Sequence, residues 1–123
     1  MGYMSEISLT IRNEDFNVLV DKARQECGET FTTLKFSEIY QNDKYTTIYL
    51  DSIRWYYDYP DVAFIESFIQ TVPHEFHRLG EDCDDYDHTY KYGGNDEYSD
   101  MWKFAKVIRK IDVSEAGEKI TLE

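Results

Sequence analysis

Residues 6–12 alternate between apolar and polar side chains. A period of two is typical of a strand with one buried face. From Asn13 onward the apolar residues follow instead at the spacing of one helical face, as far as Cys27. Asn13 can cap a helix, and Gly28 is a common residue just after a helix end. This part of the chain therefore predicts a strand followed by an amphipathic helix.

Two further segments are rich in residues that favour pleated structure, Thr, Phe and Ile in the first and Tyr, Thr and Ile in the second. They span residues 30–40 and 44–55, and the polar residues 41–43 between them are typical of a turn. We expect a long antiparallel hairpin here. Pro60 then suits the first turn of a second helix, whose apolar stripe runs to Val72.

Three more strands are expected in the second half of the chain. A short one covers residues 76–79, and a second covers residues 85–92, where tyrosines and a histidine alternate with mostly charged residues. After a Gly-rich turn, a third strand is expected over residues 101–113. The tail after Ser114 is expected to fray, because it is short and rich in charged residues.

These elements predict an α+β fold. Their order is strand, helix, two strands, helix and three strands, with local turns between neighbouring strands. A mostly antiparallel sheet of about five to six strands with two helices, arranged as a two-layer sandwich, accommodates this order. No repeat or linker divides the chain, so residues 1–123 are expected to form a single domain.

The charge of the chain is strongly acidic and unevenly distributed. It holds 13 Lys and Arg residues against 25 Asp and Glu residues, a net charge of −12. Residues 58–100 alone hold twelve acids and two bases, which gives −10. Direct binding to nucleic acid needs a basic surface, so this class of function is disfavoured. With 41% hydrophobic and 16% aromatic residues, the chain is also too apolar for an acidic disordered protein.

We expect a cytoplasmic protein. No apolar run approaches the roughly 18 residues of a membrane span, and the N-terminus lacks the basic and apolar regions of a signal peptide. The two cysteines, Cys27 and Cys83, do not form a disulfide framework. Cys27 lies on the apolar helix face, and carboxylates beside Cys83 disfavour its thiolate, so neither is expected to be a nucleophile.

No motif for catalysis or metal binding is recognisable. His74 and His77 are three residues apart, whereas a helical zinc protease needs histidines four apart. On a strand these two histidines would point to opposite faces, which favours packing or surface roles. The acidic run from Asp82 to Asp87 does not fit the calcium loop of an EF-hand. We therefore predict no catalytic residue, no cofactor and no metal; a weak cation site, or an enzyme built around residues 74–88, is a minor alternative.

The residues best suited to binding a partner are acidic and aromatic. Tyrosines among carboxylates suit a basic protein, which they contact through cation–π interactions and ion pairs. Carboxylates in a row on a strand, such as Asp85 and Asp87, would also approximate a phosphate backbone. The predicted partner-binding residues are Glu81, Asp82, Asp84, Asp85, Tyr86, Asp87, Tyr90, Asp96, Glu97, Tyr57 and Tyr59.

Several stretches of the chain have the character of a known group of proteins. They are residues 48–56 with 61–68, and residues 76–82 followed by Asp84 and Asp85. Over these stretches the chain resembles small acidic proteins encoded on phages and conjugative elements of Gram-positive bacteria. The resemblance implies a mobile-element setting, in which such proteins sometimes inhibit host defence nucleases, and it assigns no catalytic residues.

Two functions remain open from the sequence. The first is a non-enzymatic acidic binding protein that inhibits a host nucleic-acid-binding or defence protein by DNA mimicry. The second is a structural or regulatory interaction module that uses an aromatic patch, with acids only for solubility. Its expected anchor is Trp55, Tyr56, Tyr57 and Tyr59. Trp55 could equally be a core residue, in which case its replacement lowers stability.

Overall fold

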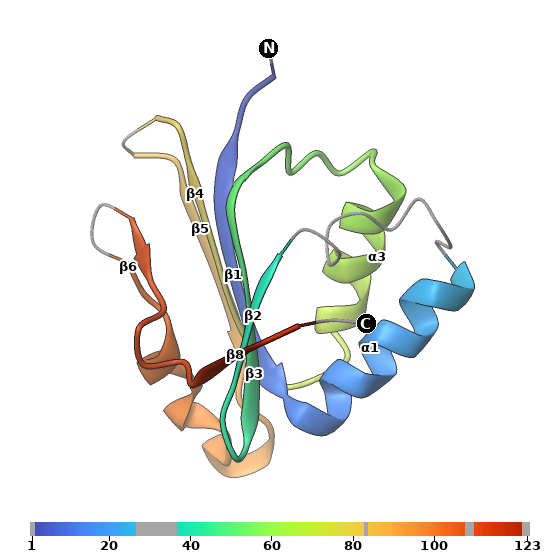
Figure 1. Cartoon of the computed structure of the whole chain (residues 1–123), viewed down its shortest axis with the longest axis vertical. Helices are drawn as coiled ribbons and strands as arrows, with labels where there is room; N and C mark the ends of the chain where they lie inside the picture. The colour runs from blue at the N-terminus through green and yellow to red at the C-terminus, as the bar shows by residue number, and fades with distance from the viewer. Residues whose placement is uncertain (1, 27–36, 83, 108–109, 122–123) are drawn as a thin grey trace.

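The computed structural model describes residues 2–26, 37–82, 84–107 and 110–121. Its main feature is an antiparallel sheet with the strand order β5-β4-β1-β3-β2-β8 (Figure 1). Helices α1 (Asn13–Glu26) and α3 (Pro60–Ile69) lie together on one face of this sheet. The strands are β1 (Ser5–Arg12), β2 (Glu38–Gln41), β3 (Tyr45–Ile53), β4 (His74–Gly80), β5 (Tyr86–Lys91) and β8 (Glu118–Ile120).

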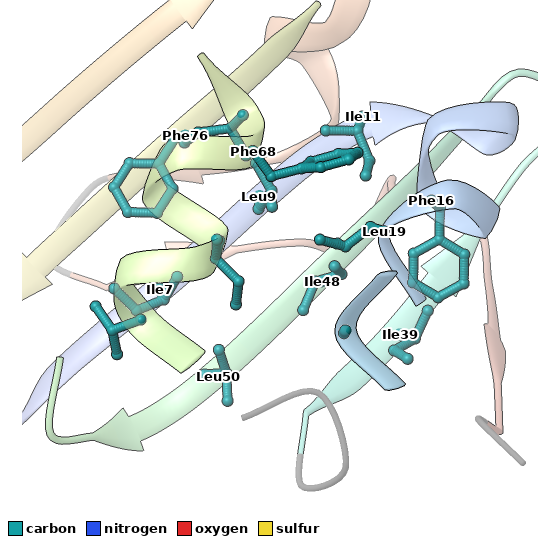
Figure 2. Packing of buried hydrophobic residues seen from close by; sticks show 14 of the residues in the cluster. Ile7, Leu9, Ile11, Phe16, Leu19, Ile39, Ile48, Leu50, Phe68 and Phe76 are labelled. Atoms are coloured by element: carbon teal, nitrogen blue, oxygen red, sulfur yellow. The ribbon is translucent and has the colours of Figure 1, made fainter. Parts of the chain in front are cut away.

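The face of the sheet under the helices carries the hydrophobic core (Figure 2). The alternation of β1 turns Ile7, Leu9 and Ile11 toward the helices, and each is at most 2% exposed. Leu19 from α1 and Phe68 from α3 pack into the same cluster. Complete burial of one such side chain contributes about 1.5–3 kcal/mol, so this layer is the main source of stability.

The opposite face of the sheet is polar and is nevertheless buried. β1 turns Glu6, Ser8 and Thr10 to this side, and none of them is more than 9% exposed. η3 (Ser99–Phe104) and a small hairpin of β6 (Lys106–Val107) with β7 (Ile111–Asp112) contact this face. Glu6 attaches the C-terminal hairpin to the sheet, because its carboxylate accepts hydrogen bonds from the backbone N–H of Ile111 at 2.9 Å and from the hydroxyl of Tyr49.

Much of the predicted organisation is confirmed. The α+β class, the antiparallel sheet, both helices and the hairpin of β2 with β3 are present. The two-layer arrangement stays a prediction, because elements of the C-terminal part also pack on the second face. β2 begins at Glu38, and the start of the strand expected over residues 30–40 lies outside the described residues. The expected helix end at Cys27 and Gly28 lies outside them as well.

The long strand expected over residues 101–113 is wrong. This part of the chain forms the 3-10 helix η3 and then the short strands β6 and β7, which pair only with each other. η3 and β7 pack against β1 on the second face of the sheet, and both edges of β1 are already paired with β3 and β4, so this segment cannot add a ladder of hydrogen bonds there. The apolar spacing of this segment satisfies a period of two, but the pattern does not show which neighbouring strands are occupied.

Residues 118–120 of the tail after Ser114 form β8 in the sheet, so the expected fraying is wrong for the part of the tail that the structure describes. β8 pairs antiparallel with β2 and places Ile120 opposite Ile39. Ala116 is completely buried, and Gly117 has a φ of +120°. A Cβ atom at Gly117 would lie 2.2 Å from the backbone oxygen of Gln41, so only glycine allows this close approach. The three residues of β8 are too few to give a recognisable alternation in the sequence.

Replacing Gly117 with alanine is expected to release β8 from the sheet. The positive φ and the clash with Gln41 together should lower the free energy of unfolding by about 1–3 kcal/mol. Gly94→Ala is the matched control, because a Cβ there meets no atom within 4 Å. Denaturant unfolding of both variants, with amide hydrogen exchange at Ile120, measures the effect. Equal stability of the two variants would contradict this account of the tail.

Candidate functional site

The predicted partner-binding residues lie mostly along one side of the molecule, on the β4–β5 hairpin. β5 is the outermost strand of the sheet, and all six of its residues are exposed. Figure 1 shows the hairpin turn at one end of β5 and the loop toward η2 (Gly94–Asp96) at the other. Glu81, Asp82 and Asp84 are exposed at the turn, and Asp96 and Glu97 are exposed in and after η2.

The acidic residues therefore form two groups rather than one row. Six strand residues separate them, which corresponds to roughly 20 Å at the rise of a β-strand. A partner that contacts both groups must extend along the whole of β5.

Asp85 and Asp87, between these two groups, are less available than the sequence suggests. Both bind the guanidinium of Arg78, at 2.5 Å from Asp85 Oδ1 and 2.7 Å from Asp87 Oδ2. The hydrogen bonds from Arg78 and then from Tyr3 lower the pKa of Asp85. One cation thus offsets part of the charge of the pair, which weakens its likeness to a bare phosphate backbone.

Aromatic side chains cover the face of the hairpin opposite to Asp85 and Asp87. Tyr86, His88 and Tyr90 lie in a row on β5, with ring centroids 6.2 Å and 5.3 Å apart. Tyr90 is 60% exposed and Tyr86 is 42% exposed. The period-two pattern of residues 85–92 predicted this shared face, and the ring contacts confirm it.

The tyrosines before α3 belong to a different part of the surface. Tyr57 is 64% exposed, and its pKa is raised by partial burial and by the charges of Glu66 and Asp87. Tyr57 therefore borders the side of the hairpin that carries Asp87. Tyr59 is 37% exposed and packs on Tyr56, with ring centroids 5.2 Å apart.

Trp55 does not belong to an exposed aromatic patch, so this anchor of the predicted interaction module is wrong. It is 6% exposed and packs against Phe76 in the core, with ring centroids 5.9 Å apart. Its indole N–H donates a hydrogen bond to Glu66 at 2.8 Å. The core reading of Trp55 is therefore the correct one.

A buried polar cluster lies beneath the aromatic row. Glu75 is 2% exposed, and its carboxylate accepts hydrogen bonds from Nε2 of His88 at 2.6 Å and from the hydroxyl of Tyr92. Burial alone would raise the pKa of Glu75, but its interactions with His77, Tyr92 and His88 outweigh burial and lower it. Nδ1 of His77 lies 2.6 Å from the hydroxyl of Tyr86. The carboxylate is thus held charged inside the protein.

Sequence reasoning missed this cluster because it compared the histidines only along the chain. His74 and His77 both lie on β4. His74 is not part of the cluster, and its Nδ1 contacts the backbone oxygen of Val72 at 3.1 Å. The contact that matters crosses the hairpin, where His77 pairs with His88. The register that follows from the turn between β4 and β5 would have revealed it. Cys83, in the same turn, lies outside the described residues.

No protein-family model matches the chain, and neither does any curated protein or solved structure. In the part of the chain that the structure describes, no helix has the length and apolar character needed to cross a membrane. The geometry of the hairpin is therefore the basis for an inference about function.

Removing the guanidinium of Arg78 is expected to raise the pKa of Asp85 toward its ordinary value of 3.8. A carboxyl group whose pKa is lowered by folding stabilises the protein at pH values above its ordinary pKa. This contribution is lost as the pH falls through the pKa of the folded state. Arg78→Gln should therefore reduce the share of acid sensitivity that comes from Asp85. NMR titration of the Asp85 carboxyl carbon measures the shift. Lys22→Gln, which removes an exposed cation from α1, is the control and should leave the Asp85 midpoint in place.

Proposed function

We propose that this chain is a non-enzymatic binding protein that engages a basic protein through the β4–β5 hairpin. The observation that carries the proposal is the exposure of the whole of β5, with acidic groups beyond both of its ends. Exposed tyrosines between the two acidic groups supply apolar area and aromatic faces. Lysine and arginine side chains bind both kinds of group, through ion pairs and cation–π contacts.

The spacing of the acidic groups describes the partner. A basic surface or extended basic segment about 20 Å long would contact both groups and cover the row of Tyr86, His88 and Tyr90. Long basic surfaces of this kind are characteristic of proteins that bind nucleic acid. The net charge of −12 would steer such a partner toward this protein from a distance.

The sharper form of the proposal is inhibition of a host nucleic-acid-binding or defence protein. The resemblance to small acidic proteins of phages and conjugative elements supports this form, and it implies action in the cytoplasm. Arg78 offsets part of the charge of Asp85 and Asp87. The mimicry of phosphate would therefore depend on the two outer acidic groups, which are the acids of the β4–β5 turn and those in and after η2. Competition would then occur at the nucleic-acid site of the partner.

Neutralising the outer groups is expected to remove binding without disturbing the fold. The variant carries Asp82→Asn, Asp84→Asn, Asp96→Asn and Glu97→Gln, all at exposed positions. The matched control carries Asp21→Asn, Glu26→Gln, Asp43→Asn and Glu118→Gln, which are exposed elsewhere and remove the same four charges. Both variants have a net charge of −8, so only the position of the lost charge differs.

The measurement starts with capture from a lysate of a Gram-positive bacterium by the immobilised parent and both variants. A protein that the parent and the control retain, and that the neutralised variant loses, is purified and its affinity is measured at low and high salt. We expect at least about a tenfold loss of affinity in the neutralised variant and weakening by salt in the parent. A neutralised variant that binds as tightly as the control would refute the acidic-surface proposal.

A second double variant separates charge from aromatic contact. Tyr57→Ser with Tyr90→Ser removes two exposed rings and leaves every carboxylate in place. Loss of binding in this variant alone, with salt-insensitive binding by the parent, would favour the aromatic interaction module instead. Competition of the purified partner with duplex DNA tests the mimicry: a partner that binds DNA and this protein at the same time would exclude it.

A further inference from the structure

A group of potential metal ligands lies under the β4–β5 hairpin, on the second face of the sheet. Glu75 and His77 lie on β4, and His88 lies opposite His77 on β5. One ligand atom of each lies within 4.8 Å of the other two, and no other group of this kind occurs among the described residues. Both Nε2 atoms face the same oxygen, Oε1 of Glu75, at 2.6 Å from His88 and 3.1 Å from His77.

His77 lacks a well-formed hydrogen bond at Nε2, although the residue is only 6% exposed. Its Nε2 is close to Glu75 but is not aligned for a hydrogen bond. Ser8, which lies opposite His77 in the register of β1 and β4, has a buried hydroxyl that is also without a partner. Buried polar atoms are nearly always satisfied by the protein, by water or by an ion. Two unsatisfied atoms at paired positions therefore mark a place suited to a bound ion or water.

We propose that Glu75, His77 and His88 bind a divalent transition-metal ion, for which Zn²⁺ is the representative. Imidazole nitrogen and carboxylate oxygen are ligands that zinc takes at about 2.0–2.2 Å, in sets that include two histidines and one glutamate. Ions such as calcium and magnesium prefer sites made of oxygen alone, so the donor set selects against them. The inference does not depend on the proposed binding of a basic protein.

The spacing of the ligand atoms is close to what an ion needs. Tetrahedral ligands at the zinc distance lie about 3.4 Å from one another. The present separations of 2.6 Å and 3.1 Å from Oε1 would widen by less than about 1 Å. His88 lies on the exposed edge strand and its side chain is 33% exposed, so this residue can move and the site is open on its side. The fourth position is left for water or another ligand.

Two tyrosines contact the proposed ligands through hydrogen bonds and would orient them toward an ion. Nδ1 of His77 lies 2.6 Å from the hydroxyl of Tyr86, and the second oxygen of Glu75 accepts a hydrogen bond from Tyr92. With the ion bound at Nε2, the proton of the neutral imidazole of His77 lies on Nδ1, from which it is donated to the hydroxyl of Tyr86. Such outer contacts fix the tautomer and orientation of a ligand. The rings of His77 and His88 are stacked 4.5 Å apart at an interplanar angle of 9°. Because an ion lies in the plane of each imidazole that binds it, the exposed ring of His88 must turn for both Nε2 atoms to reach one ion.

The first experiment is a calorimetric titration of the chelator-treated chain with Zn²⁺. We expect one ion per chain, with a Kd of about 1 µM or tighter. Affinity should fall in acid, because protons compete with the ion for the ligand atoms. Titration with Co²⁺ should produce the visible absorption of a site with nitrogen and oxygen ligands. Failure to bind one ion per chain would overturn the proposal.

Matched variants locate the ion. His88→Asn should weaken binding by at least about 100-fold, and Tyr86→Phe by about tenfold, since changes outside the ligand set typically cost 10–100-fold. His74→Asn is the control for the loss of a histidine from the other face of the same strand. Asp82→Asn with Asp84→Asn is the control for nonspecific binding to the acidic turn. Either control that weakens binding as much as His88→Asn would contradict the site.

A measurement on the unaltered chain tests the site without depending on whether a variant folds. The imidazole nitrogen resonances of His77 and His88 should shift on addition of one equivalent of Zn²⁺, with the largest change at Nε2. Those of His74 should stay in place, because its ring nitrogens contact Val72 and Thr89. A shift at His74 instead, or no shift at His77 and His88, would show that the cluster is held by protons alone.

Discussion

The structure depends on how β1 divides its side chains between the two faces of the sheet. β1 is flanked by β3 and β4, and its apolar positions Ile7, Leu9 and Ile11 all turn toward the helices. Since the side-chain period of a strand is two, a slip of one residue would exchange this face with Glu6, Ser8 and Thr10. The core under α1 and α3 therefore determines which polar residues are buried on the other side.

That constraint explains the character of the second face. Its buried polar groups need partners, because an unsatisfied one costs about 1–3 kcal/mol. Glu6 finds them in Tyr49 and in the backbone of Ile111, and the hydroxyls of Thr10 and Thr47 lie 2.8 Å apart. The C-terminal hairpin is thus held by a carboxylate from the first strand. Further toward the β5 edge, His88 and Tyr92 satisfy the carboxylate of Glu75, whereas Nε2 of His77 and the hydroxyl of Ser8 have no hydrogen-bond partner.

The β4–β5 hairpin combines two properties that come from its place at the edge of the sheet. Its outer strand is accessible along its whole length, which makes it available to a partner. Its inner strand is buried and carries Glu75 and His77 into the polar layer. Arg78, on the opposite face of β4, ties Asp85 and Asp87 back to the hairpin. The acids whose charge Arg78 does not offset are consequently those of the turn and of the loop that follows β5.

The sequence by itself determined the elements whose pattern is local. The alternation of β1, the helical stripe of α1 and the shared face of Tyr86, His88 and Tyr90 all follow from spacing along the chain. Only the tertiary structure decided which segments become neighbours. It placed β8 beside β2, prevented residues 101–113 from forming one strand, buried Trp55 and brought His88 to Glu75. The physical reason is that periodicity records the two faces of one element, whereas pairing and burial depend on which neighbouring positions are already occupied.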